Sequence, residues 1–154
     1  MRRLLLSAAL FSLAACGGGA PDAASSDEAA EAAAAADAAA DVPSVRITSP
    51  LDGDTLDAGA VTVMLEAAGV EIAPVAEGRM DTGHHHIYLD EDLRPADEPV
   101  PAIPGAIVHL GDGSSSYTFE NVAPGEHRLI TVMANLVHVP LAPQVTDTVV
   151  FYVR

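Results

Sequence analysis

From Val45 to the C-terminus the chain consists of short β-prone segments separated by turn residues, and this alternation limits the possible folds more than any other feature. β-Branched and aromatic residues, which pack well on a pleated sheet, are concentrated in the segments 45–48, 61–66, 85–89, 107–110, 117–119, 127–134 and 147–153. Proline, glycine, Asp-Gly and Pro-Gly lie between them, where turns need their backbone angles. No amphipathic helical pattern competes within this region.

About seven short strands in roughly 110 residues, spaced in this way, favour two packed antiparallel sheets. We therefore expect an all-β domain over residues 44–154, with a single immunoglobulin-like β-sandwich as the preferred architecture. A small jelly roll or a cupredoxin-like barrel is the alternative. Cys16 is the single cysteine, so the domain has no disulfide and must be stabilised by its core or by a bound ion.

The first 15 residues have the pattern of a secretory signal. A basic start, Met1 to Arg3, precedes an apolar run that is too short to span a bilayer. The run ends in Leu13-Ala14-Ala15-Cys16-Gly17, which resembles the lipobox of bacterial lipoproteins. The resemblance implies cleavage before Cys16, lipid on Cys16, and sorting to the outer membrane, facing the periplasm, because Gly17 is not aspartate. An ordinary signal peptide with an incidental cysteine is the alternative.

Residues 16–43 are expected to form a lipidated cysteine followed by a disordered tether. The segment is made almost wholly of Gly, Ala, Ser, Asp and Glu, and it lacks the large apolar side chains that would offset the entropy lost on ordering. The whole chain has a formal charge of −15 and contains no lysine. Nucleic-acid binding is therefore excluded as a partner class, whereas cations and metal ions are favoured. No protein partner and no oligomeric state can be assigned.

Three consecutive histidines, His84 to His86, lead directly into a β-prone segment. Side chains alternate between the two faces of a strand, so His84 and His86 are expected on one face with Tyr88, and His85 on the other, toward the core. A register shifted by one residue would reverse these faces. In an immunoglobulin-like sandwich, the loops that follow the second, fourth and sixth strands lie at one end, which would bring His109 and His138 to the same place.

Metal binding follows as a hypothesis. Neutral imidazole is the commonest protein ligand of Zn²⁺, Cu²⁺ and Ni²⁺. The predicted ligands are His84, His86, His109 and His138, with Met80 and Asp81 as auxiliary ligands. His85 and His127 are predicted to be structural: His85 would orient its neighbours through a hydrogen bond, and His127 would bond a nearby backbone group at a corner of the sandwich.

Four segments of the domain resemble the bacterial family of unknown function DUF4399. They are Gly83 to Asp90, His109 to Gly113, Pro124 to His127, and Asn135 to Pro140. The histidine triplet and the Pro-Gly-x-His turn are the specific parts. The resemblance implies a small secreted or lipid-anchored β-rich domain and assigns no activity.

Three functional classes stay open: a metal-binding lipoprotein, an adhesive or assembly module whose histidines are structural, and a metalloenzyme. Catalysis has the weakest support, and no catalytic residue is assigned. The serines at 114–116 lack the glycine-flanked elbow of serine hydrolases, and the acidic residues at 90–92 are consecutive, as in a solvated turn. A metal-assisted hydrolase or oxygenase would need an open coordination position and a pocket.

Overall fold

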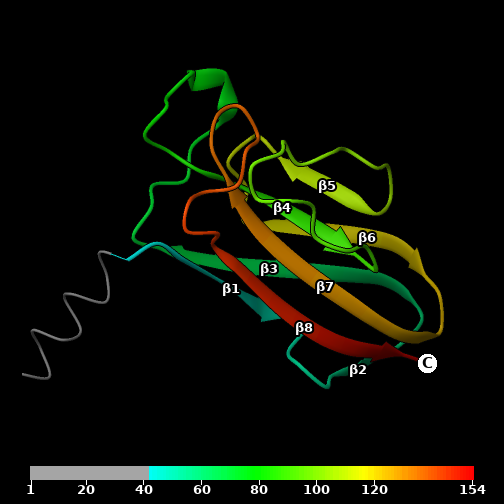
Figure 1. Ribbon diagram of the computed structural model, residues 1–154. Helices are drawn as coiled ribbons and strands as arrows, with labels where there is room; N and C mark the ends of the chain where they lie inside the picture. Colours follow the sequence, from blue (N-terminus) through cyan, green and yellow to red (C-terminus); the bar gives the residue numbers. More distant parts are fainter. Residues whose placement is uncertain (1–41) are drawn as a thin grey trace, which may run out of the picture.

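The structure of the protein, a computed structural model, describes residues 42–154. The predicted signal peptide, Cys16 and nearly all of the predicted tether lie outside the described residues. Within residues 42–154, no helical segment has the length and apolar character that a bilayer crossing requires. The described residues form two β-sheets packed face to face, so the predicted all-β sandwich is confirmed (Figure 1).

Eight strands make up the two sheets. The three-stranded sheet has the order β1 (Ser44–Ser49), β3 (Gly59–Ala68) and β6 (Ser116–Val122). The five-stranded sheet has the order β2 (Thr55–Leu56), β8 (Thr146–Val153), β7 (Gly125–Ala134), β4 (His84–Leu89) and β5 (Ile107–Leu110). The short strand β2 was not expected from the sequence, and it pairs in parallel with β8. One 3-10 turn, Val75–Glu77, lies in the loop before β4.

Strand β5 belongs to the same sheet as β4. The two strands pair antiparallel, so that His109 lies opposite His86. On the other side of β4, the end of β7 lies beside the start of β4, with Ala134 opposite His84. The loops that follow β5 and β7 therefore leave the sheet at the end where β4 begins (Figure 1).

Strand β4 is buried on both faces. Ile87 and Leu89 face the core between the sheets, whereas Tyr88 packs on the outer face of the five-stranded sheet. The predicted alternation of β4 is therefore present. The outer apolar cluster consists of Tyr88, Val100, Ile103, Ile107, Ile130, Val132 and Ala134. Since Val100 and Ile103 come from the proline-rich segment between β4 and β5, that segment covers this face.

The main core lies between the two sheets and receives alternating residues from both. Its buried members are Ile47, Val61, Val63, Leu65, Ile87, Leu110, Phe119, Val122, Leu129, Val149, Phe151 and Val153. Fully burying one such aliphatic or phenyl side chain contributes about 1.5–3 kcal/mol. The core thus supplies the stability that a domain without a disulfide needs.

His85 lies on the inner side of β4, but the hydrogen bond predicted for it is absent. Its cross-strand neighbours are Leu110 and Met133, whose side chains contain no nitrogen or oxygen atom that could accept a hydrogen bond. Both ring nitrogens are buried and have no hydrogen-bond partner among the described residues. Burial lowers the pKa of His85 to about 4, so the ring is neutral. The prediction that His85 orients its neighbours by a hydrogen bond is therefore wrong, because the strand sends its ring into an aliphatic layer.

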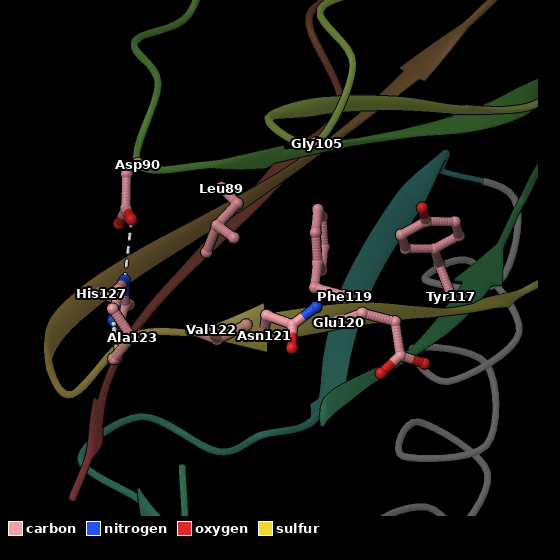
Figure 2. A pocket seen from close by; sticks show the side chains of 10 residues that line it. All are labelled: Leu89, Asp90, Gly105, Tyr117, Phe119, Glu120, Asn121, Val122, Ala123 and His127. Carbon is pink, nitrogen blue, oxygen red and sulfur yellow. Dashed lines mark hydrogen bonds and ion pairs between the residues drawn. The ribbon is translucent and has the colours of Figure 1, made fainter. Parts of the chain in front are cut away.

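His127 lies at the opposite end of the sandwich, just after the turn that joins β6 to β7. Its Nδ1 contacts Asp90 Oδ2 at 2.7 Å and its Nε2 contacts the carbonyl oxygen of Ala123 at 2.8 Å, beside a surface hollow of about 430 Å³ (Figure 2). Asp90 also accepts the backbone N–H of Arg128 at 2.9 Å. A carboxylate and a carbonyl only accept hydrogen bonds, so both contacts are satisfied together when both ring nitrogens carry a proton. Burial lowers the pKa of His127, but the bonds to Asp90 and Ala123 outweigh it and raise the pKa.

Replacing His127 by Gln is expected to destabilise the domain by about 1–3 kcal/mol at acidic pH, because hydrogen bonds to charged groups contribute on this order. Because the pKa of His127 is raised in the folded state, its protonated ring contributes fully to the free energy of unfolding below the ordinary pKa of 6.5. This contribution is lost as the pH rises through the pKa of the folded state. The difference in Tm between the wild-type and His127→Gln proteins should therefore shrink as the pH is raised from about 5 to about 9.

The buried rings of His84, His85 and His86 are present in both proteins, so their own titration cancels in this difference. A Tm difference that stays constant across the pH range would contradict the conclusion that both ring nitrogens of His127 carry a proton.

Replacing His85 by Leu is expected to stabilise the domain by roughly 1–3 kcal/mol, because a buried polar group without a partner is removed from an apolar site. The measurement is the Tm of both proteins near neutral pH. An unchanged or lower Tm in His85→Leu would show that the ring has a partner or a packing role that the contacts do not reveal.

Candidate metal centre

Four histidines from three chain segments meet on the outer face of the five-stranded sheet. His84 and His86 lie two residues apart on β4 and therefore share a face. His109 is the cross-strand partner of His86 on β5, and directly opposed residues of paired strands point to the same side. His138 comes from the loop between β7 and β8, which leaves the sheet beside His84. The four rings thus meet at the end where β4 begins, on the outer face of the sheet.

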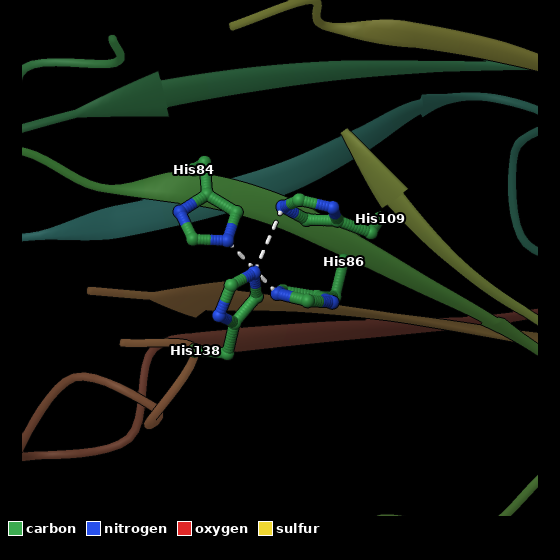
Figure 3. Close-up of side chains that lie close together, drawn as sticks. All are labelled: His84, His86, His109 and His138. Carbon is green, nitrogen blue, oxygen red and sulfur yellow. Dashed lines mark hydrogen bonds between the residues drawn. The ribbon is translucent and has the colours of Figure 1, made fainter. Parts of the chain in front are cut away.

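The ring nitrogens of these four histidines, which we call the histidine cluster, point toward a common centre (Figure 3). The Nε2 atoms of His84 and His86 are 3.0 Å apart, and those of His109 and His138 are 3.2 Å apart. One nitrogen from each ring lies within 4.8 Å of all the others. Nitrogens bound to one tetrahedral ion at 2.0–2.1 Å would be separated by about 3.3 Å. Small side-chain movements would therefore suffice for all four rings to bind one ion.

The cluster is buried on one side and open on the other. His84 and His86 are each only 1% exposed, whereas His138 is partly buried and His109 is exposed. Burial, and secondarily the neighbouring rings, lower the pKa of His84 to about 4 and that of His86 to about 3. Burial also lowers the pKa of His109. These three rings are therefore neutral near pH 7, which is the state in which imidazole binds metal ions.

A tight turn holds His138 in place. The side-chain oxygen of Asn135 accepts the backbone N–H groups of Val137 and Val139 at 3.0 and 3.1 Å. Within this turn His138 adopts a positive φ of 66°, which is uncommon for a residue other than glycine. Its carbonyl oxygen accepts the N–H of Val100 at 2.9 Å, so the turn is also tied to the proline-rich segment.

Gly111 leaves the space that the ring of His109 occupies. A Cβ atom at Gly111 would overlap the Cε1 and Nε2 atoms of that ring. An alanine there would therefore push the imidazole out of its place. Sequence reasoning assigned no site role to Gly111, because a glycine that follows a strand is usually a turn residue.

A pocket of about 280 Å³ lies beside the cluster. Three of the rings, those of His86, His109 and His138, form one part of its wall. The rest of the wall is the segment Pro99 to Ala102. The segment lies between the predicted strands 85–89 and 107–110 and was assigned no role from the sequence, so the pocket was not expected.

The two predicted auxiliary ligands do not join the cluster. Met80 is 67% exposed in the turn before β4. The carboxylate of Asp81 contacts Arg79 at 3.1 Å, and Arg79 also binds Glu71. Asp81 therefore belongs to an ion-pair group at the surface, and the donor set consists of four imidazoles.

Comparisons with known proteins give a family and no activity. No curated protein matches the chain. Among solved structures, a crystal structure of an engineered protein is similar, with a TM-score of 0.43 and 14% sequence identity over 73% of this chain. This chain spans 20% of the length of that protein. The family described as "Domain of unknown function (DUF4399)" matches residues 63–154, which include all six histidines, and the chain belongs to this family.

Proposed function

We propose that this protein is a cell-envelope lipoprotein that binds a divalent transition-metal ion through His84, His86, His109 and His138. The convergence of four ring nitrogens within 4.8 Å is the observation that carries the proposal. Two of these rings are buried with strongly lowered pKa values, so their lone pairs are available near neutral pH. Perturbed pKa values of clustered groups beside a pocket are typical of functional sites.

The donor set favours Cu²⁺, Zn²⁺ or Ni²⁺. It contains imidazole nitrogens only, and imidazole suits these ions, whereas thiolates select Cu⁺ and carboxylates suit Mg²⁺ and Ca²⁺. For a given site the affinity increases from Ni²⁺ to Cu²⁺ and falls again at Zn²⁺. We therefore expect Cu²⁺ to bind most tightly when each ion is offered alone.

Binding is tested on the chain from Gly17 to Arg154, made without an affinity tag. Free Cu²⁺ or Zn²⁺ at about 100 times its Kd should stabilise the protein by about 2.7 kcal/mol, which raises the Tm by several degrees. The double variant His84→Ala/His86→Ala should lose this rise. His85→Leu is the matched control, because it changes the third histidine of the triplet, whose ring lies on the other face, and it should keep the rise.

Gly111→Ala supplies a variant that changes no ligand. Displacement of the His109 ring should raise the Kd for the ion by at least about tenfold, since metal sites depend on well-placed ligands. If no ion changes the Tm of the wild-type protein, the metal proposal is wrong. The two close ring pairs would then be hydrogen bonds within a structural or partner-binding module.

We also propose that Cys16 anchors the protein in the outer membrane, facing the periplasm. The support is the lipobox-like sequence that ends at Cys16, which is the only cysteine of the chain. Several acyl chains on one residue give stable anchoring, whereas a single chain is marginal. The long acidic segment after Cys16 would act as a spacer between the membrane and the domain.

Replacing Cys16 by Ala is expected to release the protein from the membrane fraction. The measurement is fractionation of cells from a double-membraned bacterium, with mass spectrometry of the mature N-terminal peptide. Gly17→Asp is the matched control: it should keep the lipid but move the protein to the inner membrane. Recovery of the wild-type protein in the soluble fraction, with an unmodified Cys16, would contradict the anchor.

A further inference from the structure

We infer that the metal centre takes a small anion as an additional ligand, bound in the pocket between the rings and the segment Pro99 to Ala102. The inference rests on the proposed metal binding and goes beyond it, since it names what the centre binds. Three features support it: the charge of the metal centre, its opening to solvent on one side, and the volume of the pocket beside it.

The charge argument starts from the donor set. Four neutral imidazoles bound to a divalent ion leave a net charge of +2 at a site where two rings are 1% exposed. An uncompensated charge in such surroundings is unfavourable. The described residues place no carboxylate among the donors. Asp112 lies close enough to interact with the charge of His109, but its carboxylate accepts the backbone N–H of Ser114 at 3.0 Å and is not one of the donors.

The outer nitrogen of His86 does not disperse this charge either. A histidine that binds a metal through one nitrogen usually donates its other N–H to a carboxylate or carbonyl. In His86 that other nitrogen, Nδ1, is buried and has no partner among the described residues. The donor set and the outer nitrogen of His86 therefore contribute no negative charge, and a bound anion would supply it.

The pocket provides the place for that ligand. It borders His86, His109 and His138 but not His84, so it opens on the exposed side of the cluster. Its volume of about 280 Å³ exceeds the roughly 30 Å³ that one water takes up in the liquid, so an anion of several atoms fits. The facing wall, Pro99 to Ala102, carries no charged side chain that would repel or neutralise an anion.

The wall is also held firmly enough to define a site. Val100 is 7% exposed and packs in the outer apolar cluster. Its N–H donates to the carbonyl of His138 at 2.9 Å, which fixes the wall relative to one of the rings. An apolar wall opposite a cationic centre selects a weakly hydrated monoanion over a strongly hydrated one, because the anion has to give up part of its water.

The test uses azide as the probe and the chain from Gly17 to Arg154 loaded with Cu²⁺. Loading is measured first, from the d–d absorption of the bound ion. Azide is then titrated, and a saturable azide-to-copper charge-transfer band is expected. Ala102→Phe, which fills the pocket without changing a ring, should raise the Kd for azide by at least about tenfold. Ala58→Phe, an exposed alanine near β2 at the opposite edge of the sheet, should leave it unchanged.

The outcomes separate the two proposals. If Cu²⁺ does not load, the anion site is overturned, and the metal proposal is wrong as well if no other ion changes the Tm. If Cu²⁺ loads and azide gives no saturable band, or if Ala102→Phe binds azide as the wild type does, only the anion site is overturned. Ala102→Leu is the second pocket variant, to be used in the same way if Ala102→Phe fails to fold or to load the ion.

Discussion

The position of β4 between β5 and β7 is the constraint on which the site depends. Pairing on both sides fixes the register of β4, so His84 and His86 must face outward and His85 must face the core. A slip of one residue would exchange these faces and leave a single ring of the triplet on the outer side. The same pairing places His109 directly opposite His86. The relative positions of His84, His86 and His109 thus follow from the alternation and pairing of strands, and Gly111 leaves room for the ring of His109.

Strand pairing brings rings together, but the irregular segments make the outer face a buried site. The outer face of an antiparallel sheet is often solvated. Here the proline-rich segment covers part of it, and the turn after β7 brings His138 from the other side. The hydrogen bond between Val100 and His138 joins these two covering segments. The result is a cluster that is dry enough to keep its rings neutral and open enough, beside His109, to admit an ion.

The sequence predicts the sandwich and the face of each histidine in the triplet, because both follow from the period of two in a strand. It also brings His109 and His138 to the same end, because loop positions in such a sandwich are regular. It does not predict that β5 pairs with β4, that Gly111 makes room for a ring, or that residues 99–102 form a pocket wall. These features depend on tertiary packing of segments without periodicity. Met80 and Asp81 are predicted as ligands because they lie close to the triplet in sequence. Since both lie in the turn before β4, this closeness does not bring their side chains to the cluster.

Burial has different consequences for the different histidines of the triplet. Burial lowers the pKa of His84 and His85 to about 4 and that of His86 to about 3, so all three disfavour protonation in the folded state. Below the ordinary histidine pKa of 6.5 the unfolded chain binds protons at these rings, whereas the folded chain does not. The stability of the domain therefore falls as the pH drops from 6.5 toward the lowered pKa values of the folded state. Apolar residues at these three positions would avoid this loss of stability. Residues that lower the stability of the fold are characteristic of functional sites. At His84 and His86 burial keeps a lone pair ready for an ion, whereas at His85 it is a destabilisation that the apolar core must outweigh.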